Sequence, residues 1–304
     1  MSTKDTLQKA LVFDIQRFSI HDGPGIRTAI FFKGCPLRCR WCQNPEGLDP
    51  GPEISFCKDR CLGCRECQAV CPLQAILFDG PRRIDRRLCD RCGKCVEVCH
   101  TGALQLIGRP YTPEGLLSEV LRDVAFFDAS GGGITLSGGE PTYQLEFLTA
   151  FLPLAKGERL HIAMETCGYV SYEKLRTIIP FLNLILYDIK AIDSALHRRL
   201  TRRSNATILE NLKRLLYNGV AVQVRVPLIP CLTATEDNLR DIALFLRDQG
   251  INEVDLLPYH KMGESKLERI DSPLRPLNLS TLDDGEVTSI SALFQDAGLA
   301  QFKS

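Results

Sequence analysis

The clustering of cysteines constrains the fold of this chain more than any other feature of its sequence. The chain has 14 cysteines among 304 residues, and twelve of them lie between Cys35 and Cys99. The N-terminal segment MSTKDTLQKALVFDIQ lacks the basic start and apolar run of a signal peptide, and no run of about 18 apolar residues could span a bilayer. We therefore expect a cytoplasmic protein with reduced thiols, in which clustered cysteines indicate metal ligands rather than disulfides.

Two of the cysteine runs have the same spacing. CLGCRECQAVCP and CDRCGKCVEVCH each separate four cysteines by two, two and three residues. This is the spacing of bacterial two-cluster ferredoxins, in which the fourth cysteine of each run ligates the other run's [4Fe–4S] cluster. The spacing therefore predicts two ligand sets, which are Cys61, Cys64, Cys67 and Cys99 for one cluster, and Cys71, Cys89, Cys92 and Cys95 for the other.

The other features of this region are compatible with that interpretation. The second run ends in His100 instead of proline, which weakens its turn but leaves its ligands unchanged. A zinc ribbon is the alternative for eight clustered cysteines, and the doubled ferredoxin spacing argues against it. Cys57, Cys61 and Cys64 also have the spacing C-x3-C-x2-C, which is that of Cys35, Cys39 and Cys42. Cys61 and Cys64 already belong to a complete ferredoxin run, however, so we do not interpret Cys57 as a ligand. The remaining cysteines are interpreted as buried or free thiols, and these are Cys57, Cys167 and Cys231.

The rest of the chain alternates apolar runs of strand character with amphipathic runs of helical period. Strands are expected at residues 28–34, 133–138, 160–166, 182–188, 220–228 and 253–259. Helices are expected at residues 112–127, 143–156, 205–219 and 235–250. The first helix has Thr112 as its N-cap and Pro113 at its first position. This alternation predicts a parallel α/β sheet with right-handed crossovers, either open or part of a (β/α) barrel.

Residues 51–105 interrupt the alternation, since they hold nine cysteines and few long apolar runs. We expect them to form a ferredoxin-like insert in a barrel domain made of residues 1–50 and 106–304. The net charge of the chain does not indicate a charged partner, because lysine and arginine number 37 together, as do aspartate and glutamate. We therefore expect neither nucleic acid nor a membrane as a partner.

The motif C-x3-C-x2-C, formed by Cys35, Cys39 and Cys42, follows the first expected strand. A [4Fe–4S] cluster held by three thiolates has one iron with an open coordination position. Catalytic zinc sites use an open position in the same way, to bind a reactant. A structural site whose fourth ligand lies elsewhere is the alternative. The three-cysteine site is therefore expected to perform chemistry, and the four-cysteine sites are expected to carry electrons.

The sequence around this motif, DGPGIRTAIFFKGCPLRCRWCQNPE, resembles the glycyl-radical-enzyme activating enzymes of the radical S-adenosylmethionine (SAM) superfamily. The DGPG-x-R segment, the cysteine spacing after a strand, Trp41 and the NPE that follows Cys42 carry the resemblance, which extends over most of the chain. It implies a partial (β/α)6 barrel of the TIM type with an inserted ferredoxin-like domain. It also implies three [4Fe–4S] clusters, the first of which is chelated by the amino and carboxylate groups of SAM.

The resemblance also implies the site residues, which fall at the ends of strands where (β/α) barrels hold their active sites. The residues expected to bind SAM are Trp41, Cys42, Gln43, Gly138, Gly139, Glu140, Asp188, Ile189, Lys190, Arg225 and His260. A monovalent cation is a further implication, held by Glu165, Thr166 and Asp188. Asp22 and Gly23 are expected to contact the glycine loop of the partner enzyme.

The implied reaction starts with reduction of the three-cysteine cluster by flavodoxin or ferredoxin, with a relay through the insert clusters left open. SAM is then cleaved to methionine and a 5′-deoxyadenosyl radical, which removes a hydrogen from one backbone glycine of a partner glycyl radical enzyme. Expected partners are dehydratases and lyases, such as those of glycerol or diols, choline and sulfonates. An exposed iron implies anaerobic function. The alternatives are a radical SAM enzyme acting on a small molecule, and an electron carrier of ferredoxin type.

Overall fold

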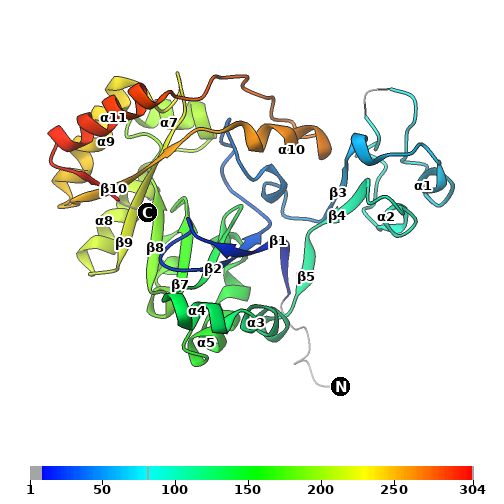
Figure 1. Cartoon of the computed structure of the whole chain (residues 1–304), viewed down its shortest axis with the longest axis horizontal. Helices are drawn as coiled ribbons and strands as arrows, with labels where there is room; N and C mark the ends of the chain where they lie inside the picture. The colour runs from blue at the N-terminus through cyan, green and yellow to red at the C-terminus, as the bar shows by residue number, and fades with distance from the viewer. Residues whose placement is uncertain (1–8, 81, 303–304) are drawn as a thin grey trace.

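Six parallel strands form the centre of the structure, a computed structural model that describes residues 9–80 and 82–302 (Figure 1). They are β2 (Arg27–Phe32), β6 (Gly133–Gly138), β7 (Ile162–Thr166), β8 (Leu184–Asp188), β9 (Val222–Leu228) and β10 (Glu253–Pro258). Neighbouring strands of this set all pair in parallel. Every residue of β2 is buried, as expected of a parallel strand covered on both faces. The six predicted strands and their parallel α/β arrangement are therefore confirmed.

Three further strands, which the sequence pattern does not predict, extend this sheet to nine. β1 (Ala10–Ser19) pairs antiparallel with β2, β5 (Arg109–Tyr111) pairs antiparallel with β1, and β11 (Ala300–Gln301) pairs in parallel with β10. The order β11-β10-β9-β8-β7-β6-β2-β1-β5 leaves β11 and β5 as edges among the described residues, so the sheet is open there. Parts of the predicted N-terminal segment, insert and barrel domain lie outside the described residues, namely residues 1–8, Pro81 and residues 303–304.

Helices fill the connections between the strands. They are α3 (Pro113–Leu121), α4 (Val124–Ser130), α5 (Leu145–Gly157), α6 (Tyr172–Leu175), α7 (Ser194–Thr201), α8 (Ala206–Tyr217), α9 (Glu236–Asp248), α10 (Glu264–Arg269) and α11 (Asp284–Asp296). In Figure 1, α3, α4 and α5 lie below the sheet, and α8, α9 and α11 lie at its left. No helix within residues 9–80 and 82–302 is long and apolar enough to cross a membrane.

The helix predicted at residues 112–127 is divided into α3 and α4. Its start is as predicted, because Gly115 N donates to the Thr112 side chain at 3.1 Å and Pro113 occupies the first turn. The division falls at Asp123, whose buried carboxylate accepts a hydrogen bond from Thr28 Oγ1 at 2.7 Å and pairs with Arg17. These partners come from β2 and β1, so tertiary contacts override the helical period here.

The main hydrophobic core lies between the sheet and the helices that cover it, among them α3, α5, α8, α9 and α11. Phe147 and Phe151 of α5 are buried and stacked, with ring centroids 5.7 Å apart. Phe147 also contacts Phe32, the last residue of β2, at 6.1 Å between centroids. This packing fixes the end of β2, from which the three-cysteine loop departs.

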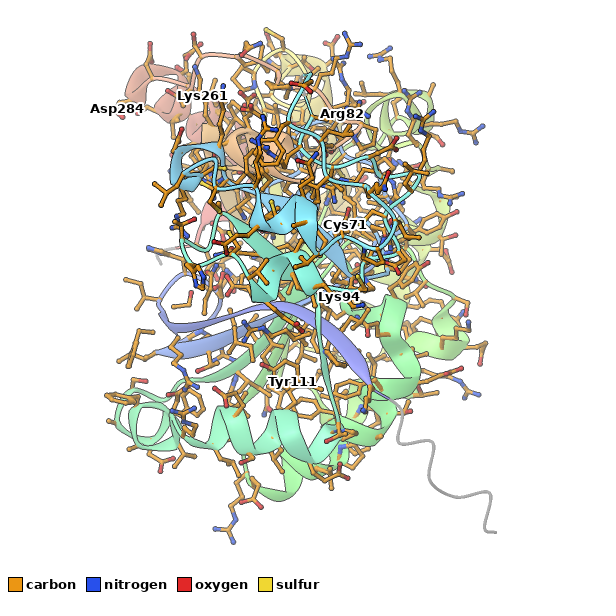
Figure 2. The ribbon with its side chains drawn as sticks, turned by 90° about the vertical axis from the view of Figure 1, so that its right-hand side faces the viewer. Cys71, Arg82, Lys94, Tyr111, Lys261 and Asp284 are labelled. Atoms are coloured by element: carbon orange, nitrogen blue, oxygen red, sulfur yellow. The ribbon has the colours of Figure 1, made fainter. Side chains whose placement is uncertain are left out.

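The segment between β2 and β6 contains a second, smaller sheet, in which β3 (Glu53–Phe56) pairs antiparallel with β4 (Leu104–Ile107). Two short helices belong to it, α1 (Glu66–Ala69) and α2 (Lys94–Glu97). Its own core is made of Ile54, Ile76, Ile84, Cys95 and Leu104. The part from β3 to β4 lies at the right of Figure 1 and faces the viewer in Figure 2, where Cys71, Arg82 and Lys94 are labelled. The boundary expected after residue 105 falls inside β4, so paired strands form the base of this segment.

Candidate active site

The three cysteines of the C-x3-C-x2-C motif lie in the loop that follows β2. Burial raises the pKa of Cys39 to about 12, with the charge of Lys190 opposing the shift and that of Cys35 adding to it. Burial also raises the pKa of Cys42, and the charges of Cys39 and Cys35 add to that shift. A turn brings Cys42 N within 3.2 Å of Cys39 O. The three thiols are half-buried and their charges affect one another's pKa, so they lie together in one site.

This set of thiols fits an iron–sulfur cluster better than a single ion. Among residues 9–80 and 82–302, no three His, Cys, Asp or Glu side chains are arranged to hold one metal ion. Each thiolate of a [4Fe–4S] cluster binds a different iron, so its sulfur atoms need not surround one point. Soft sulfur donors in a buried site are the ligands such clusters take.

A fourth cysteine, Cys167, lies beside the motif. A hydrogen bond between the thiols of Cys35 and Cys167 lowers the pKa of Cys35 and raises that of Cys167. Cys167 directly follows β7 and is buried, which agrees with its interpretation as a buried or free thiol. The sequence does not predict that Cys167 lies beside Cys35. It does predict that METCG, which contains Cys167, ends a strand at the same edge of the sheet as the cysteine loop.

Gly138, the last residue of β6, and Gly139, which follows it, bring the end of that strand against the cysteine loop. A Cβ at Gly138, whose φ is +108°, would lie 2.4 Å from Phe32 N. A Cβ at Gly139 would lie 2.4 Å from the carbonyl oxygens of both Gly34 and Gly47. Gly34 and Gly47 flank the three cysteines in sequence. The two glycines of SGGEP thus permit close approach of backbone to backbone around the cysteine loop.

Glu140 connects the same rim to β7. Its side chain is 1% exposed, and Oε1 accepts hydrogen bonds from Thr142 Oγ1 at 2.7 Å and Thr166 Oγ1 at 2.9 Å. Its Oε2 accepts a hydrogen bond from Cys167 N at 2.8 Å. Both carboxylate oxygens therefore have protein donors, which hold the ends of β6 and β7 together.

A buried ionic row crosses the ends of three strands. Asp188 of β8 lies in register with Arg225 of β9, and Arg225 Nη2 lies 3.1 Å from Asp188 Oδ1. Lys190 Nζ donates to Asp188 Oδ2 at 3.0 Å, and Arg225 Nη1 pairs with Glu165 of β7. Ile189 connects the row through its backbone, since Ile189 N donates to Arg225 O at 2.9 Å. The sequence therefore places these side chains correctly at one rim.

The charges in this row oppose the effect of burial on the pKa values of its members. Burial alone would raise the pKa of Asp188, but Lys190 and Arg225 outweigh it and hold that pKa below its usual value. Burial would lower the pKa of Arg225, and the carboxylates of Glu165 and Asp188 raise it instead. Burial dominates at Glu165 and raises its pKa against the charge of Arg225. The opposite charges of Asp188 and Arg225 therefore favour each other's charged form, whereas burial favours the neutral form of Glu165.

The three residues expected to hold a monovalent cation have protein partners instead. Glu165 accepts a hydrogen bond from Ser137 Oγ in addition to its pair with Arg225. Thr166 donates to Glu140, and Asp188 pairs with Lys190 and Arg225. Because the lysine and arginine charges already occupy this position, the structure gives no support to the cation.

Asp255 of β10 is a further member of the site that the sequence does not predict. It lies in register with Arg225 on the side opposite to Asp188. Burial raises its pKa, against the charge of Arg225 and with a smaller opposing effect of His21. Its alternation with Val254 and Leu256 along β10 is the signal in the sequence that could have revealed it.

Trp41, Gln43 and His260 lie at the side of the site near β10. Gln43 Nε2 donates to His260 O at 2.9 Å, and Gly263 N donates to Gln43 Oε1 at 3.0 Å. The indole of Trp41 is 8% exposed and packs in a small apolar cluster with Leu200, Ile229 and Tyr259. The side chain of His260 is exposed. The structure thus brings the three residues together, but it buries most of the Trp41 ring within the protein.

The DGPG segment lies across the start of β6 and is held by Arg27. This arginine is fully buried, and it donates to Thr135 Oγ1 at 2.6 Å and Pro24 O at 2.9 Å. Thr135 in turn donates to Asp22 O at 2.7 Å. Burial lowers the pKa of Arg27 to about 10, with the charge of Asp22 opposing the shift. Gly23 has a φ of +116° beside this guanidinium, so Asp22 and Gly23 are fixed in position.

Eight of the nine cysteines of the insert divide between two cavities, in the sets predicted from their spacing. One cavity, of about 170 Å³, is lined by Cys61, Cys64, Cys67 and Cys99. The other is lined by Cys71, Cys89, Cys92 and Cys95. The fourth cysteine of each run therefore faces the first three of the other run. This crossed arrangement fits two four-iron clusters.

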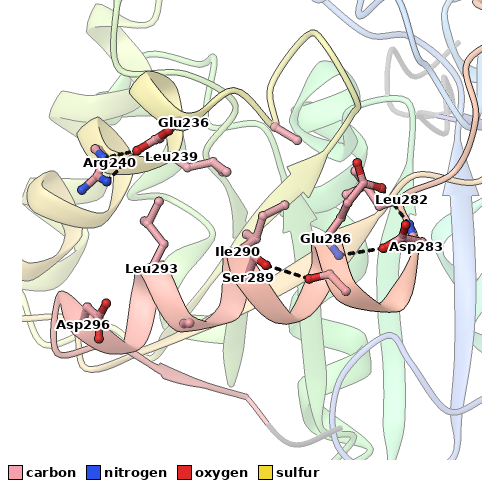
Figure 3. Close-up of a pocket in the computed structure, with 13 residues that line it drawn as sticks. Glu236, Leu239, Arg240, Leu282, Asp283, Glu286, Ser289, Ile290, Leu293 and Asp296 are labelled. Atoms are coloured by element: carbon pink, nitrogen blue, oxygen red, sulfur yellow. Dashed lines mark hydrogen bonds and ion pairs between the residues drawn. The ribbon is translucent and has the colours of Figure 1, made fainter.

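A surface hollow lies away from all these cysteines, between α9 and α11 (Figure 3). Its volume is about 780 Å³. Several of its charged groups have local partners: Arg240 pairs with Glu236, and Asp283 and Glu286 cap the start of α11. We assign no site to it.

Comparison with known proteins agrees with this geometry. The sequence model of the Radical SAM superfamily matches residues 29–246. The isethionate sulfite-lyase activating enzyme of Oleidesulfovibrio alaskensis is 41% identical over 300 residues, which cover 96% of each chain. The trans-4-hydroxy-L-proline dehydratase activating enzyme of Clostridioides difficile is 37% identical over 290 residues, or 94% of this chain and 96% of that enzyme.

Among solved structures, SuiB of Streptococcus suis bound to its precursor peptide SuiA is similar in fold. The match covers 88% of this chain and 46% of SuiB, with a TM-score of 0.52 and 11% sequence identity. This similarity concerns the fold alone.

Proposed function

The chain belongs to the radical SAM superfamily and, within it, to the activating enzymes of glycyl radical enzymes, and we propose that it acts with three [4Fe–4S] clusters. An enzyme of this kind reductively cleaves SAM to methionine and a 5′-deoxyadenosyl radical, which removes a hydrogen atom from a backbone glycine of its partner. The cluster and SAM supply this chemistry. The protein binds, orients and shields them.

The observation that carries the proposal is the position of Cys35, Cys39 and Cys42 at the same rim as the ionic row. Lys190 lies near enough to Cys39 for its charge to lower the pKa of that thiol. Lys190 and Arg225 can therefore face the carboxylate of a SAM molecule held at the open iron. The carboxylates of Asp188 and Glu165 can accept hydrogen bonds from its ribose.

The remaining SAM contacts follow from the same rim. Gly138 and Gly139 bring the end of β6 against the cysteine loop, and Glu140 stabilises that end through Thr166. Gln43 and His260 border the side near β10, where the adenine would lie. The full proposed set is Trp41, Cys42, Gln43, Gly138, Gly139, Glu140, Asp188, Ile189, Lys190, Arg225 and His260.

We assign the other two clusters to a ferredoxin-like insert of residues 51–105. The two cysteine-lined cavities support this assignment, because each holds four cysteines drawn from both runs. Reduced flavodoxin or ferredoxin is the proposed electron donor. In this proposal the insert clusters pass electrons toward the three-cysteine cluster.

The partner we propose is a lyase or dehydratase with a glycyl radical, whose glycine loop meets Asp22 and Gly23. The relatives described above include the activating enzymes of isethionate sulfite-lyase and of trans-4-hydroxy-L-proline dehydratase. Arg27 and Thr135 hold this segment at the start of β6, and the charge of Asp22 acts on Glu165 of the ionic row, which supports the proposed contact.

The test is activation of a purified partner. Reconstituted protein should contain about twelve iron atoms per chain if three [4Fe–4S] clusters are present. With reductant, SAM and either isethionate sulfite-lyase or trans-4-hydroxy-L-proline dehydratase, it should generate a glycyl radical detectable by electron paramagnetic resonance (EPR). About four iron atoms per chain would contradict the three-cluster proposal, and no radical in either partner would contradict the proposed partner class.

A further inference from the structure

Arg83 occupies an unusual position in the insert, between two aromatic rings and a cysteine cavity. Its guanidinium carbon lies 3.8 Å from the centroid of the Phe78 ring and 4.7 Å from that of Phe56. Its Nη2 lies 3.9 Å from Cys61 Sγ, within hydrogen-bonding distance for sulfur. Stacking on two rings holds a guanidinium in one orientation, and here that orientation directs it at a cysteine.

The second terminal nitrogen of Arg83 has no partner. Nη1 is buried and makes no hydrogen bond within the part of the chain that the structure describes. Arg83 also lines the cavity formed by Cys61, Cys64, Cys67 and Cys99. A buried cationic donor without an acceptor is unfavourable, and the sulfur atoms of a cluster in this cavity would provide acceptors.

The cavity of the other four cysteines lacks such a group. Its only basic lining residue is Lys94, which is exposed. Backbone donors are similar in the two cavities: Ala75 N lies 3.2 Å from Cys71 Sγ, and Leu104 N lies 3.4 Å from Cys99 Sγ. The Arg83 cavity is also lined by Arg65, Glu66 and His100, but these three are exposed, as are Asp90 and Lys94 of the other cavity. Among the described residues, Arg83 is therefore the partly buried charge that distinguishes the two cavities.

The two cavities also differ in their distance from the barrel. Glu53, the first residue of β3, pairs with Lys33 of the loop after β2 at 2.8 Å. Ile54 lines the cavity of Cys71, Cys89, Cys92 and Cys95, whereas Phe56, two residues farther along β3, lines the Arg83 cavity. The Arg83 cavity is thus the outer of the two.

We propose that Arg83 raises the reduction potential of the cluster on Cys61, Cys64, Cys67 and Cys99, so that this outer cluster accepts the first electron. Hydrogen bonds to cluster sulfurs and nearby positive charge both favour the reduced form, which carries one more negative charge. The proposal rests on the proposed function, which supplies the insert clusters. It assigns Arg83 the role of directing electrons from the donor to the outer end of the insert.

The test uses the full chain with Cys35, Cys39 and Cys42 replaced by alanine, so that only the insert clusters remain. Stepwise reduction with dithionite, followed by EPR, should show two one-electron steps. Arg83→Met and Arg83→Gln should each lower the higher midpoint by at least a tenfold change in the reduction equilibrium, which is 59 mV for one electron. Arg82→Gln is the matched control, because it removes an adjacent, exposed arginine and should leave both midpoints unchanged.

The outcomes separate the two proposals. If the parent protein with three alanines binds no iron, the proposed function fails in its insert clusters. If it binds about eight iron atoms but both Arg83 variants retain the parent midpoints, the role of Arg83 is overturned. Should Arg83→Met lose a cluster, Arg83→Gln decides the matter, since its amide retains a hydrogen-bond donor without the charge, on a shorter side chain.

Discussion

The guanidinium of Arg225 lies between two carboxylates on neighbouring parallel strands, with Asp188 of β8 on one side and Asp255 of β10 on the other. It pairs with Asp188 at 3.1 Å and also with Glu165 of β7. One cation thus joins three neighbouring strands near their carboxyl ends. In the proposed site, SAM would meet charges that are already held in place by protein partners.

Removing this cation should destabilise the protein strongly. Arg225→Met leaves the buried carboxylates of Glu165 and Asp188 without their main partner, and breaking a buried ion pair on one side costs about 3–5 kcal/mol. Urea unfolding monitored by circular dichroism measures the free energy of unfolding. Arg240→Gln breaks an exposed pair with Glu236 and should cost less than about 1 kcal/mol. Equal, small effects of both variants would contradict the structural role of Arg225.

Replacing Asp255 by asparagine should stabilise the protein at high pH. The pKa of Asp255 is raised by burial, so its folded pKa lies above the unfolded value of about 3.9. Between these values the folded state binds more protons, and stability falls as pH rises through this window. Asp255→Asn should therefore be more stable than wild type at pH 8, and the difference in unfolding free energy should shrink as pH falls toward the unfolded pKa. A difference that grows on acidification would contradict this sign.

Gly139 should tolerate no side chain. Gly139→Ala places a methyl group 2.4 Å from two carbonyl oxygens that flank the cysteine loop, so the loop must move away from β6. We expect a loss of about four iron atoms per chain, measured by iron assay after reconstitution. Gly157→Ala is the control: nothing lies within 4 Å of its Cβ, and alanine favours the end of α5. Full iron content in Gly139→Ala would show that the close approach is not required.

Lys33 should fix the base of the insert. It is fully buried, and its Nζ donates to Glu46 O at 2.7 Å and Glu53 Oε2 at 2.8 Å. Lys33→Met leaves Glu53 unpaired and should speed amide hydrogen exchange in β3 and β4. The double variant Lys33→Met with Glu53→Leu should recover part of the protection, since replacing both partners avoids an uncompensated charge. Lys58→Met, at an exposed lysine of the same segment, should change nothing. Identical exchange in Lys33→Met and wild type would contradict the proposed contact.

Features encoded locally could be predicted from the sequence. Apolar runs identified the six parallel strands, and cysteine spacing identified the two sets that line separate cavities. The residues at strand ends also met as expected, because parallel strands bring their carboxyl ends to one edge.

Features that depend on contacts between distant parts of the chain could not be predicted from the sequence. Asp123 divides a predicted helix because Arg17 and Thr28 bind its carboxylate from other strands. Cys167 and Arg83 acquire their positions beside cysteines only in the folded chain. The expected cation at Glu165 has no support because the charge of Arg225 lies there. No sequence period marks such contacts.

The central claim is that the cluster on Cys35, Cys39 and Cys42 binds and cleaves SAM. The most direct measurement is EPR of the anaerobically reduced protein before and after SAM is added, together with assay of methionine. We predict that SAM changes the spectrum and that methionine forms in wild type and in Cys231→Ala, but that neither occurs in Cys39→Ala. Intact SAM in the reduced wild-type protein with its partner present, or equal cleavage by Cys39→Ala, would contradict the account.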